Sequence, residues 1–157
     1  MDAVLIIHVI ISLLGIVSGY VVIGGMLQAQ RLPRWTAFFL VTTVLTSATG
    51  FLFPFVKLLP SHILAILSLI VLAVAIYALY SKHLAGKWRA AYVVTAIIAQ
   101  YFNVFVLIVQ AFQKLPPLHA LAPTQSEPPF AVAQGVNLLA FIALGYLATK
   151  TFHPTAS

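Results

Sequence analysis

The side chains in this sequence that could do chemistry are histidines and carboxamides set into long apolar runs. His8 lies in the first run and His62 at the start of the third. At about 1.5 Å of rise per residue, the two imidazoles are expected at similar depth on helices that run in the same direction. They could bind a b-type haem through its axial positions, or join His119 at a copper or zinc ion. The alternative is that His8 bonds a neighbouring helix and His62 is an interfacial residue after a Ser61 cap.

Small residues follow His8 on the same predicted helical face. Ser12, Gly15 and Gly19 stand four, seven and eleven residues after His8, which places them below the imidazole. Gly15-x-x-x-Gly19 is also a close-packing motif of membrane helices. This face is expected either to let a flat macrocycle approach the backbone or to receive a neighbouring helix.

A polar stripe marks the apolar run over residues 88–112. Gln100, Asn103 and Gln110 stand at i, i+3 and i+10, and Tyr92 stands eight residues before Gln100. A helix places all four on one face. A carboxamide that faces lipid leaves donors and acceptors unpaired at several kcal/mol each, so this face is expected to turn toward protein or water.

Two further amides, Gln134 and Asn137, share a face of the last apolar run because they are three residues apart. The simplest interpretation is that Asn137 hydrogen-bonds with Asn103 across two helices, a contact that contributes about 0.6 kcal/mol on average. The functional interpretation is a polar pocket in the outer half of the membrane for a quinone headgroup, a small polar solute or a cofactor edge. The residues predicted to line this pocket are His8, His62, Asn103, Gln110, Gln134 and Asn137.

The second apolar run is rich in threonine. Thr42, Thr46 and Thr49 share one predicted face. Hydroxyls in membrane helices commonly bond to the carbonyl four residues earlier in their own helix. We therefore expect most of these side chains to be satisfied locally. The alternative is that the shared face of Thr42, Thr46 and Thr49 adds to the wall of the pocket.

Residues that catalysis normally requires are scarce. The only acids are Asp2 and Glu127, so there are no paired carboxylates within a run and no Ser-His-Asp arrangement. Glycine-rich phosphate loops and metalloprotease motifs are also missing from the sequence. No charged residue falls near the middle of a predicted helix, which argues against proton-coupled or voltage-sensing machinery. No catalytic residue is proposed, and an enzyme is the less favoured class.

The composition indicates where these side chains must be held. Hydrophobic residues make up 62% of the 157-residue chain and charged residues 6%, whereas soluble domains carry about 25% charged residues. A multi-pass membrane protein is the class that fits. Cysteine is absent, which removes disulfides and thiolate metal sites.

Five apolar runs of about 20 residues are each long enough to cross the roughly 30 Å hydrocarbon layer. We predict an all-α bundle of five transmembrane helices that forms one domain over residues 1–157. The helices are expected over about 3–26, 35–56, 61–80, 88–112 and 130–152. Pro54 should end or bend the second helix.

The basic residues predict the orientation. Six fall on one side of the predicted bundle and two, Lys57 and Lys114, on the other. The positive-inside rule then places the N-terminus outside and the C-terminus in the cytoplasm. The six on the cytoplasmic side are Arg31, Arg34, Lys82, Lys87, Arg89 and Lys150.

The loop over residues 113–129 is the one sizeable segment outside the predicted helices. It holds five prolines, which favour a stiff, extended backbone. We expect it either to cover the outer mouth of the bundle, bringing His119 or Glu127 above the pocket, or to dock a membrane-protein partner.

Two stretches carry a resemblance to known proteins: TSATGFLFPF at residues 46–55 and LAPTQSEPPF at residues 121–130. They are similar to segments of a family of small, uncharacterised bacterial inner-membrane proteins. The resemblance extends over most of the chain. It implies location in a bacterial inner membrane and brings no activity, cofactor or site residues with it.

Three functions are compatible with these patterns. The working hypothesis is a redox or cofactor-binding membrane protein that holds haem b or a quinone. The alternatives are a structural or assembly subunit of a membrane complex, and a facilitator for a small neutral solute. The facilitator requires a continuous wetted path between the two faces, and the cytoplasmic halves of the predicted helices hold few polar residues.

Overall fold

The protein, described here from a computed structural model over residues 3–52 and 60–154, is helical throughout its regular structure, and these residues contain no strand. Six α-helices follow one another along the chain, and the third continues into a short π-helix, η1. Their bounds are α1 Ala3–Leu27, α2 Pro33–Gly50, α3 Pro60–Ile76, η1 Tyr77–Ser81, α4 Lys87–Lys114, α5 Pro116–Leu121 and α6 Pro128–Thr151.

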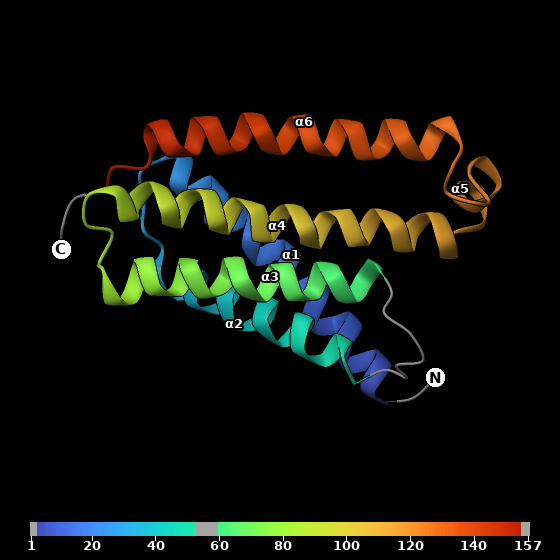
Figure 1. Ribbon diagram of the computed structural model, residues 1–157, viewed down its shortest axis with the longest axis horizontal. Coiled ribbons are helices and arrows are strands. Elements are labelled where there is room, and N and C mark those ends of the chain that lie inside the picture. The colour runs from blue at the N-terminus through green and yellow to red at the C-terminus, as the bar shows by residue number, and fades with distance from the viewer. Residues whose placement is uncertain (1–2, 53–59, 155–157) are drawn as a thin grey trace.

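The helix α4 occupies the centre of the bundle. It packs against α3 on one side and α6 on the other, and α1 crosses behind it (Figure 1). The helix α2 lies along α1 and reaches α3. The expectation that the other apolar segments gather around the polar stripe of residues 88–112 is confirmed.

Four helical segments are long and apolar enough to cross a membrane: Ala3–Leu27, His62–Ser81, Lys87–Lys114 and Pro128–Thr151. The prediction of an all-helical bundle is therefore confirmed over the described residues, and the four candidate spans are consistent with a multi-pass membrane protein. The helix α2 is not among the four, because Arg34 and six side-chain hydroxyls lower its hydropathy.

Two predicted segments differ from the structure. The second helix was expected over 35–56 but ends at Gly50, where the turn Phe51–Leu52 follows. Pro54 lies outside the described residues.

The loop over 113–129 was expected to be extended, yet it contains the helix α5. The prolines Pro116 and Pro117 occupy the first positions of α5, where a fixed φ favours helix and the missing N–H costs nothing.

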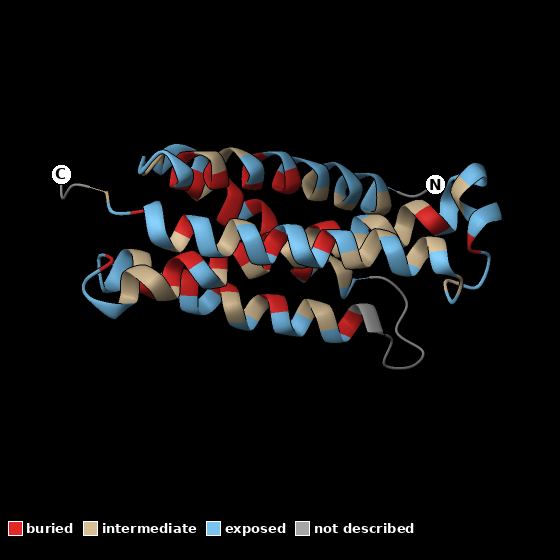
Figure 2. Cartoon of the chain, turned by 90° about the horizontal axis from the view of Figure 1, so that it is seen from above, coloured by how far each residue is buried: buried red, intermediate tan, exposed pale blue. Residues whose placement is uncertain are grey.

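The burial pattern separates a packed interior from an exposed, largely apolar exterior. Buried residues line the faces that the helices turn toward one another, and exposed residues cover the outer faces (Figure 2). In the half of the bundle near the α3–α4 connection, large side chains fill the interior, among them Met26, Phe39, Leu72, Tyr92 and Val93. Most of the α6 surface is exposed and apolar, as expected for a helix in contact with lipid.

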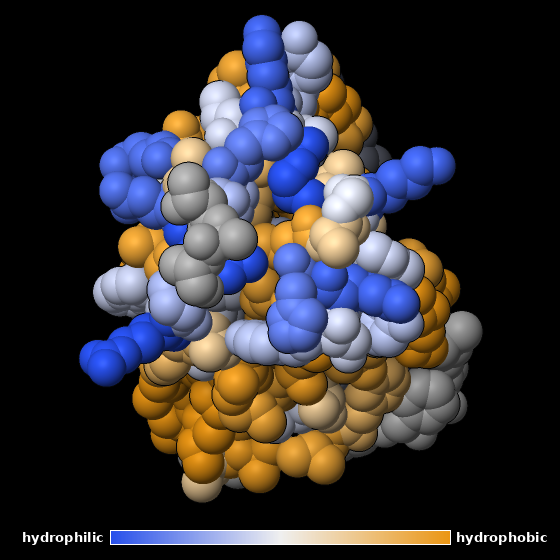
Figure 3. Space-filling view, turned by 90° about the vertical axis from the view of Figure 1, so that its left-hand side faces the viewer, coloured by the Kyte–Doolittle hydropathy of each residue, from blue (hydrophilic) through white to orange (hydrophobic). Residues whose placement is uncertain are grey.

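We call the end of the bundle that carries Arg31, Arg34, Lys82, Lys87, Arg89 and Lys150 the basic end. Figure 3 shows hydrophilic side chains gathered over this end. Arg89 of α4 closes the last turn of α6, because its Nη1 donates to the carbonyls of Thr149 at 2.8 Å and Phe152 at 2.9 Å. A cation at this position satisfies terminal carbonyls and interacts favourably with the helix dipole.

The opposite end holds α5 and the turn into α6. The Glu127 carboxylate accepts hydrogen bonds from the Thr124 hydroxyl at 2.7 Å and from the Ser126 amide at 3.1 Å. The Gln125 side chain donates to the Val109 carbonyl of α4 at 3.0 Å. These contacts fix the turn against α4 and set the position at which α6 begins.

Acid is expected to loosen this turn. The hydrogen bond from Thr124, followed by bonds from backbone amides, holds the pKa of Glu127 below its ordinary value of 4.5. The stabilisation is therefore fully present above the ordinary pKa and is lost as the pH falls through the lower pKa of the folded state. The NMR shift of the Ser126 amide should titrate with a midpoint below 4.5, and Thr124→Val should move that midpoint upward. An unshifted midpoint in the native protein contradicts the prediction, and Glu127→Gln is the control that should not titrate.

Candidate functional site

The carboxamide of Gln100, on α4, is fully buried. Its Nε2 donates to the carbonyl of Ile16 on α1 at 2.8 Å. The contact is possible only because Gly19 has no side chain: a Cβ built there would lie within 2.2 Å of the Gln100 Oε1. The small face of α1 thus receives a carboxamide from α4.

Asn103 extends this contact to a third helix. Its Nδ2 donates to the Thr43 Oγ1 of α2 at 3.3 Å and to the Gln100 Oε1 at 3.4 Å. Gly15 lets α1 approach α2 closely, since a Cβ there would meet the Thr42 and Thr43 hydroxyls at 3.3 Å. We call Gly15, Gly19, Thr43, Gln100 and Asn103 the polar lock.

Three of the five threonines of α2 are satisfied within their own helix, which agrees with the expectation that most would be. Thr42 donates to the Phe38 carbonyl, Thr46 to the Thr42 carbonyl and Thr49 to the Leu45 carbonyl, each at 2.7 Å. Local pairing of this kind allows a hydroxyl-rich helix to lie in an apolar environment without unpaired donors.

Both candidate haem ligands lie beside the C-terminal end of α2. The His8 Nδ1 is 2.7 Å from the Thr49 Oγ1, and the His62 ring stacks on Phe51 at 5.7 Å between centroids. His62 is buried, whereas His8 is half-buried. His8 therefore joins α1 to α2 through a hydrogen bond. The sequence indicated this role as the alternative to binding a haem or a metal ion.

The face expected to cradle a macrocycle is already filled. Hydroxyls of α2 occupy the space at Gly15, and the Gln100 amide occupies the space at Gly19. A haem lying flat on this face would have to displace the polar lock. The third candidate metal ligand, His119, lies on α5 with its Nδ1 3.3 Å from the Phe112 carbonyl. Among the residues that the structure describes, no three His, Asp or Glu side chains gather where they could hold a metal ion.

The amides of α6 are placed differently from those of α4. The Gln134 Nε2 donates to the Phe105 carbonyl of α4 at 3.2 Å, but its Oε1 is buried with no hydrogen-bond partner. Asn137 is only 8% exposed, and its Nδ2 is also buried with no partner. The predicted bond between Asn103 and Asn137 does not form, because Asn103 turns toward α2 instead. The residues predicted to line one pocket therefore separate into two groups, with Asn103 facing α2 and with Gln134 and Asn137 on α6. Gln110 lies half-buried farther along α4.

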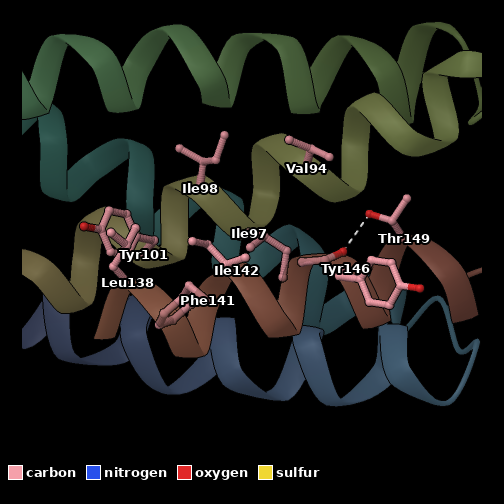
Figure 4. A pocket seen from close by; sticks show the side chains of 10 residues that line it. Val94, Ile97, Ile98, Tyr101, Leu138, Phe141, Ile142, Tyr146 and Thr149 are labelled. Carbon is pink, nitrogen blue, oxygen red and sulfur yellow. Dashed lines mark hydrogen bonds between the residues drawn. The ribbon is translucent and has the colours of Figure 1, made fainter. Parts of the chain in front are cut away.

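An apolar groove of about 400 Å³ follows the seam between α4 and α6 (Figure 4). Tyr101, Leu138 and Phe141 lie at one end, and Tyr146 and Thr149 at the other. Thr149 does not offer its hydroxyl proton to the groove, since it donates to the Gly145 carbonyl at 2.7 Å. Gln134 and Asn137 are not among the residues that line the groove, but Phe141, which does line it, lies one helical turn beyond Asn137 on the same face of α6.

Sequence reasoning placed Gln100 on the polar stripe but not among the site residues. The sequence signal that could have identified α1 as the partner of Gln100 is the Gly15-x-x-x-Gly19 pair. Two glycines at this spacing leave room for a side chain from a neighbouring helix. The groove had no comparable signal, because its lining is made of ordinary apolar residues.

A methyl group at position 19 tests the polar lock. Gly19→Ala is expected to expel the Gln100 amide and leave it buried without its partner, which costs about 1–3 kcal/mol. Thermal unfolding in detergent should show this as a lower midpoint. Gly24→Ala is the matched control, because a Cβ there meets nothing within 4 Å. Gln100→Ala in the Gly19→Ala background should restore part of the loss, and strictly additive effects would show that the two positions are not in contact.

Known proteins provide no template for this arrangement. Comparison with protein families, with curated proteins and with solved structures finds no match to the chain. The function is therefore inferred from the placement of the protein's own residues.

Proposed function

We propose that this protein is an integral membrane protein that binds a neutral, hydroxyl-bearing apolar ligand of the quinol class at the seam between α4 and α6. The observation that carries the proposal is the pair of unpaired amide atoms on α6. The Gln134 Oε1 lacks a donor and the Asn137 Nδ2 lacks an acceptor. A buried polar group left in this state costs about 1–3 kcal/mol.

A ligand hydroxyl offers both the donor and the acceptor that these atoms lack. Its proton can be donated to the Gln134 Oε1, and its oxygen can accept from the Asn137 Nδ2. A quinone carbonyl can only accept, so it would leave Gln134 unpaired. The arrangement therefore favours the reduced form, the quinol, over the oxidised form.

The depth of the amides selects against charged headgroups. Asn137 lies near the middle of α6, at roughly 4 Å from its centre for a rise of about 1.5 Å per residue. A phosphate at this depth would be strongly disfavoured. A quinol ring is neutral and largely apolar, and the elongated groove along α4 and α6 can accept an isoprenoid tail.

Of the two cofactors considered from the sequence, the geometry favours the quinone class over haem b. The macrocycle would compete with the polar lock, whereas the seam between α4 and α6 is open. A facilitator for a small solute is disfavoured, because its path would cross the packed side chains near the basic end.

A structural or assembly role is the second candidate. It is favoured by α5, which has no buried residue and exposes most of its side chains. A partner docked on the 113–129 loop would cover this helix. Stoichiometric co-purification that is lost when α5 is altered would support this role.

The proposed setting is a bacterial inner membrane with five spans, the N-terminus outside and the C-terminus in the cytoplasm. The helix α2 has 18 residues, which gives a length of about 27 Å, close to the hydrocarbon thickness of roughly 30 Å. Three of its six hydroxyls are paired with carbonyls of the same helix, which lowers the cost of placing it across the membrane. The basic end would face the cytoplasm.

Ligand binding is tested with a short-chain ubiquinol kept reduced by dithionite. The reduced probe is expected to raise the unfolding temperature of the native protein, because a ligand that binds the folded state stabilises it. Asn137→Leu should weaken binding at least tenfold, which corresponds to about 1.4 kcal/mol. Gln110→Leu is the matched control, since it removes a half-buried amide from α4 outside the seam.

Without the probe, Asn137→Leu should be at least as stable as the native protein, because an unpaired buried donor has been removed. A loss of binding would then not reflect misfolding. The proposal is wrong if the reduced probe leaves the native protein unchanged or stabilises Asn137→Leu equally.

The span count is tested by single cysteines, since the chain contains none. Gln28→Cys and Ala85→Cys lie at exposed positions that flank the α2–α3 pair, and Ala120→Cys lies on α5. If α2 spans, a membrane-impermeant maleimide added to intact cells should label Ala120→Cys and spare the other two. Labelling of Gln28→Cys or Ala85→Cys, but not both, would show that α2 does not cross.

A further inference from the structure

We propose that the groove formed by Arg34, Trp35 and Phe38 at the basic end holds an anionic phospholipid. The groove has a volume of about 280 Å³. Trp35 and Phe38 form its apolar wall as an edge-to-face pair with centroids 6.4 Å apart. The site uses none of the residues at the seam between α4 and α6, so it stands independently of the proposed quinol binding.

The basic end carries more charge than the described part of the chain balances. The chain holds eight Lys and Arg but only two acids. Glu127, the acid within the described residues, lies at the opposite end of the bundle, before α6. The Nε of Arg31 is buried with no hydrogen-bond partner within the described part of the chain. This excess of positive charge favours an anion from outside the protein.

Arg34 is the basic residue that lines the groove. Two of its basic neighbours are engaged elsewhere: Arg89 donates to the carbonyls of α6, and Lys82 lies over the Tyr77 ring at 5.5 Å and the Trp88 ring at 5.9 Å. No such contact is found over residues 3–52 and 60–154 for Arg34, Lys87 or Lys150, and of these three only Arg34 lines the groove. A guanidinium can bind a phosphodiester through two parallel hydrogen bonds.

The wall of the groove continues as a track for an acyl chain. Trp35, Phe38, Val41 and Leu45 recur at helical spacing along α2, and their exposed fractions are 45%, 41%, 57% and 42%. An indole at the boundary is typical of the headgroup region. The track leads from the Arg34 cation at the boundary into the apolar region. This arrangement matches a phospholipid, which has an anionic headgroup and apolar chains. A free phosphate ion has no apolar part and would leave the track unused.

The test is native mass spectrometry of the protein released from nanodiscs of mixed phosphatidylglycerol and phosphatidylcholine. The native protein should retain one phosphatidylglycerol in preference to phosphatidylcholine. Arg34→Gln and Phe38→Ala should each reduce the retained fraction several-fold. Lys150→Gln is the matched control, because it removes one charge from the same end without touching the groove.

Equal losses in Arg34→Gln and Lys150→Gln would overturn the proposal, since they would show attraction by net charge alone. No preference for phosphatidylglycerol in the native protein would also overturn it. Glycerol phosphate added as a competitor should not displace the lipid, and displacement would show that the site takes a free phosphate instead. The unfolding temperature of each variant establishes that it is folded.

Discussion

The constraint on which this structure depends is that a hydrogen-bonding group in hydrocarbon must find its partner within the protein. Water is unavailable there, and each unpaired group costs several kcal/mol. The polar lock meets this constraint by joining three helices through two amides. Gln100 reaches the α1 backbone, and Asn103 reaches Thr43 of α2. Because apolar side chains pack on lipid nearly as well as on each other, these directional contacts define which helices are neighbours.

The same constraint explains why α2 can be less apolar than the other long helices. Thr42, Thr46 and Thr49 donate to carbonyls of the same helix, and Thr36 donates to the Arg31 carbonyl just before it, so these four hydroxyls do not require water. Thr43 and Thr49 also meet side chains from α4 and α1. A hydropathy average counts every hydroxyl as a cost, whereas the folded helix presents most of them already paired. The mean hydropathy of α2 therefore understates how well it suits an apolar environment.

The sequence was sufficient to predict the helices and the inward direction of the amides. Apolar runs of this length have few alternatives to a helix, and Gln100 and Asn137 are indeed buried. The partners were not predictable, because they depend on how each helix is rotated and on which neighbour it meets. Asn103 was expected to meet Asn137 but faces α2, since α4 turns its polar stripe toward α1 and α2. The helix α5 was missed because its prolines were interpreted as stiffening an extended chain and not as the first residues of a helix.

The two sets of amides differ in a way that separates packing from binding. If the amides of α6 served only to hold helices together, they would be expected to resemble those of α4, with partners on the neighbouring helix. Gln134 does reach the Phe105 carbonyl, so the contact that packing requires is already made. What remains is one acceptor on Gln134 and one donor on Asn137, three residues apart on α6. A leucine at position 137 would pack against α4 without an unpaired group, so helix packing alone does not explain the asparagine. A bound hydroxyl would offer a partner to these atoms, which is why we propose the ligand site at the seam between α4 and α6 and not in the more polar interior around Gln100, where the amides already have partners.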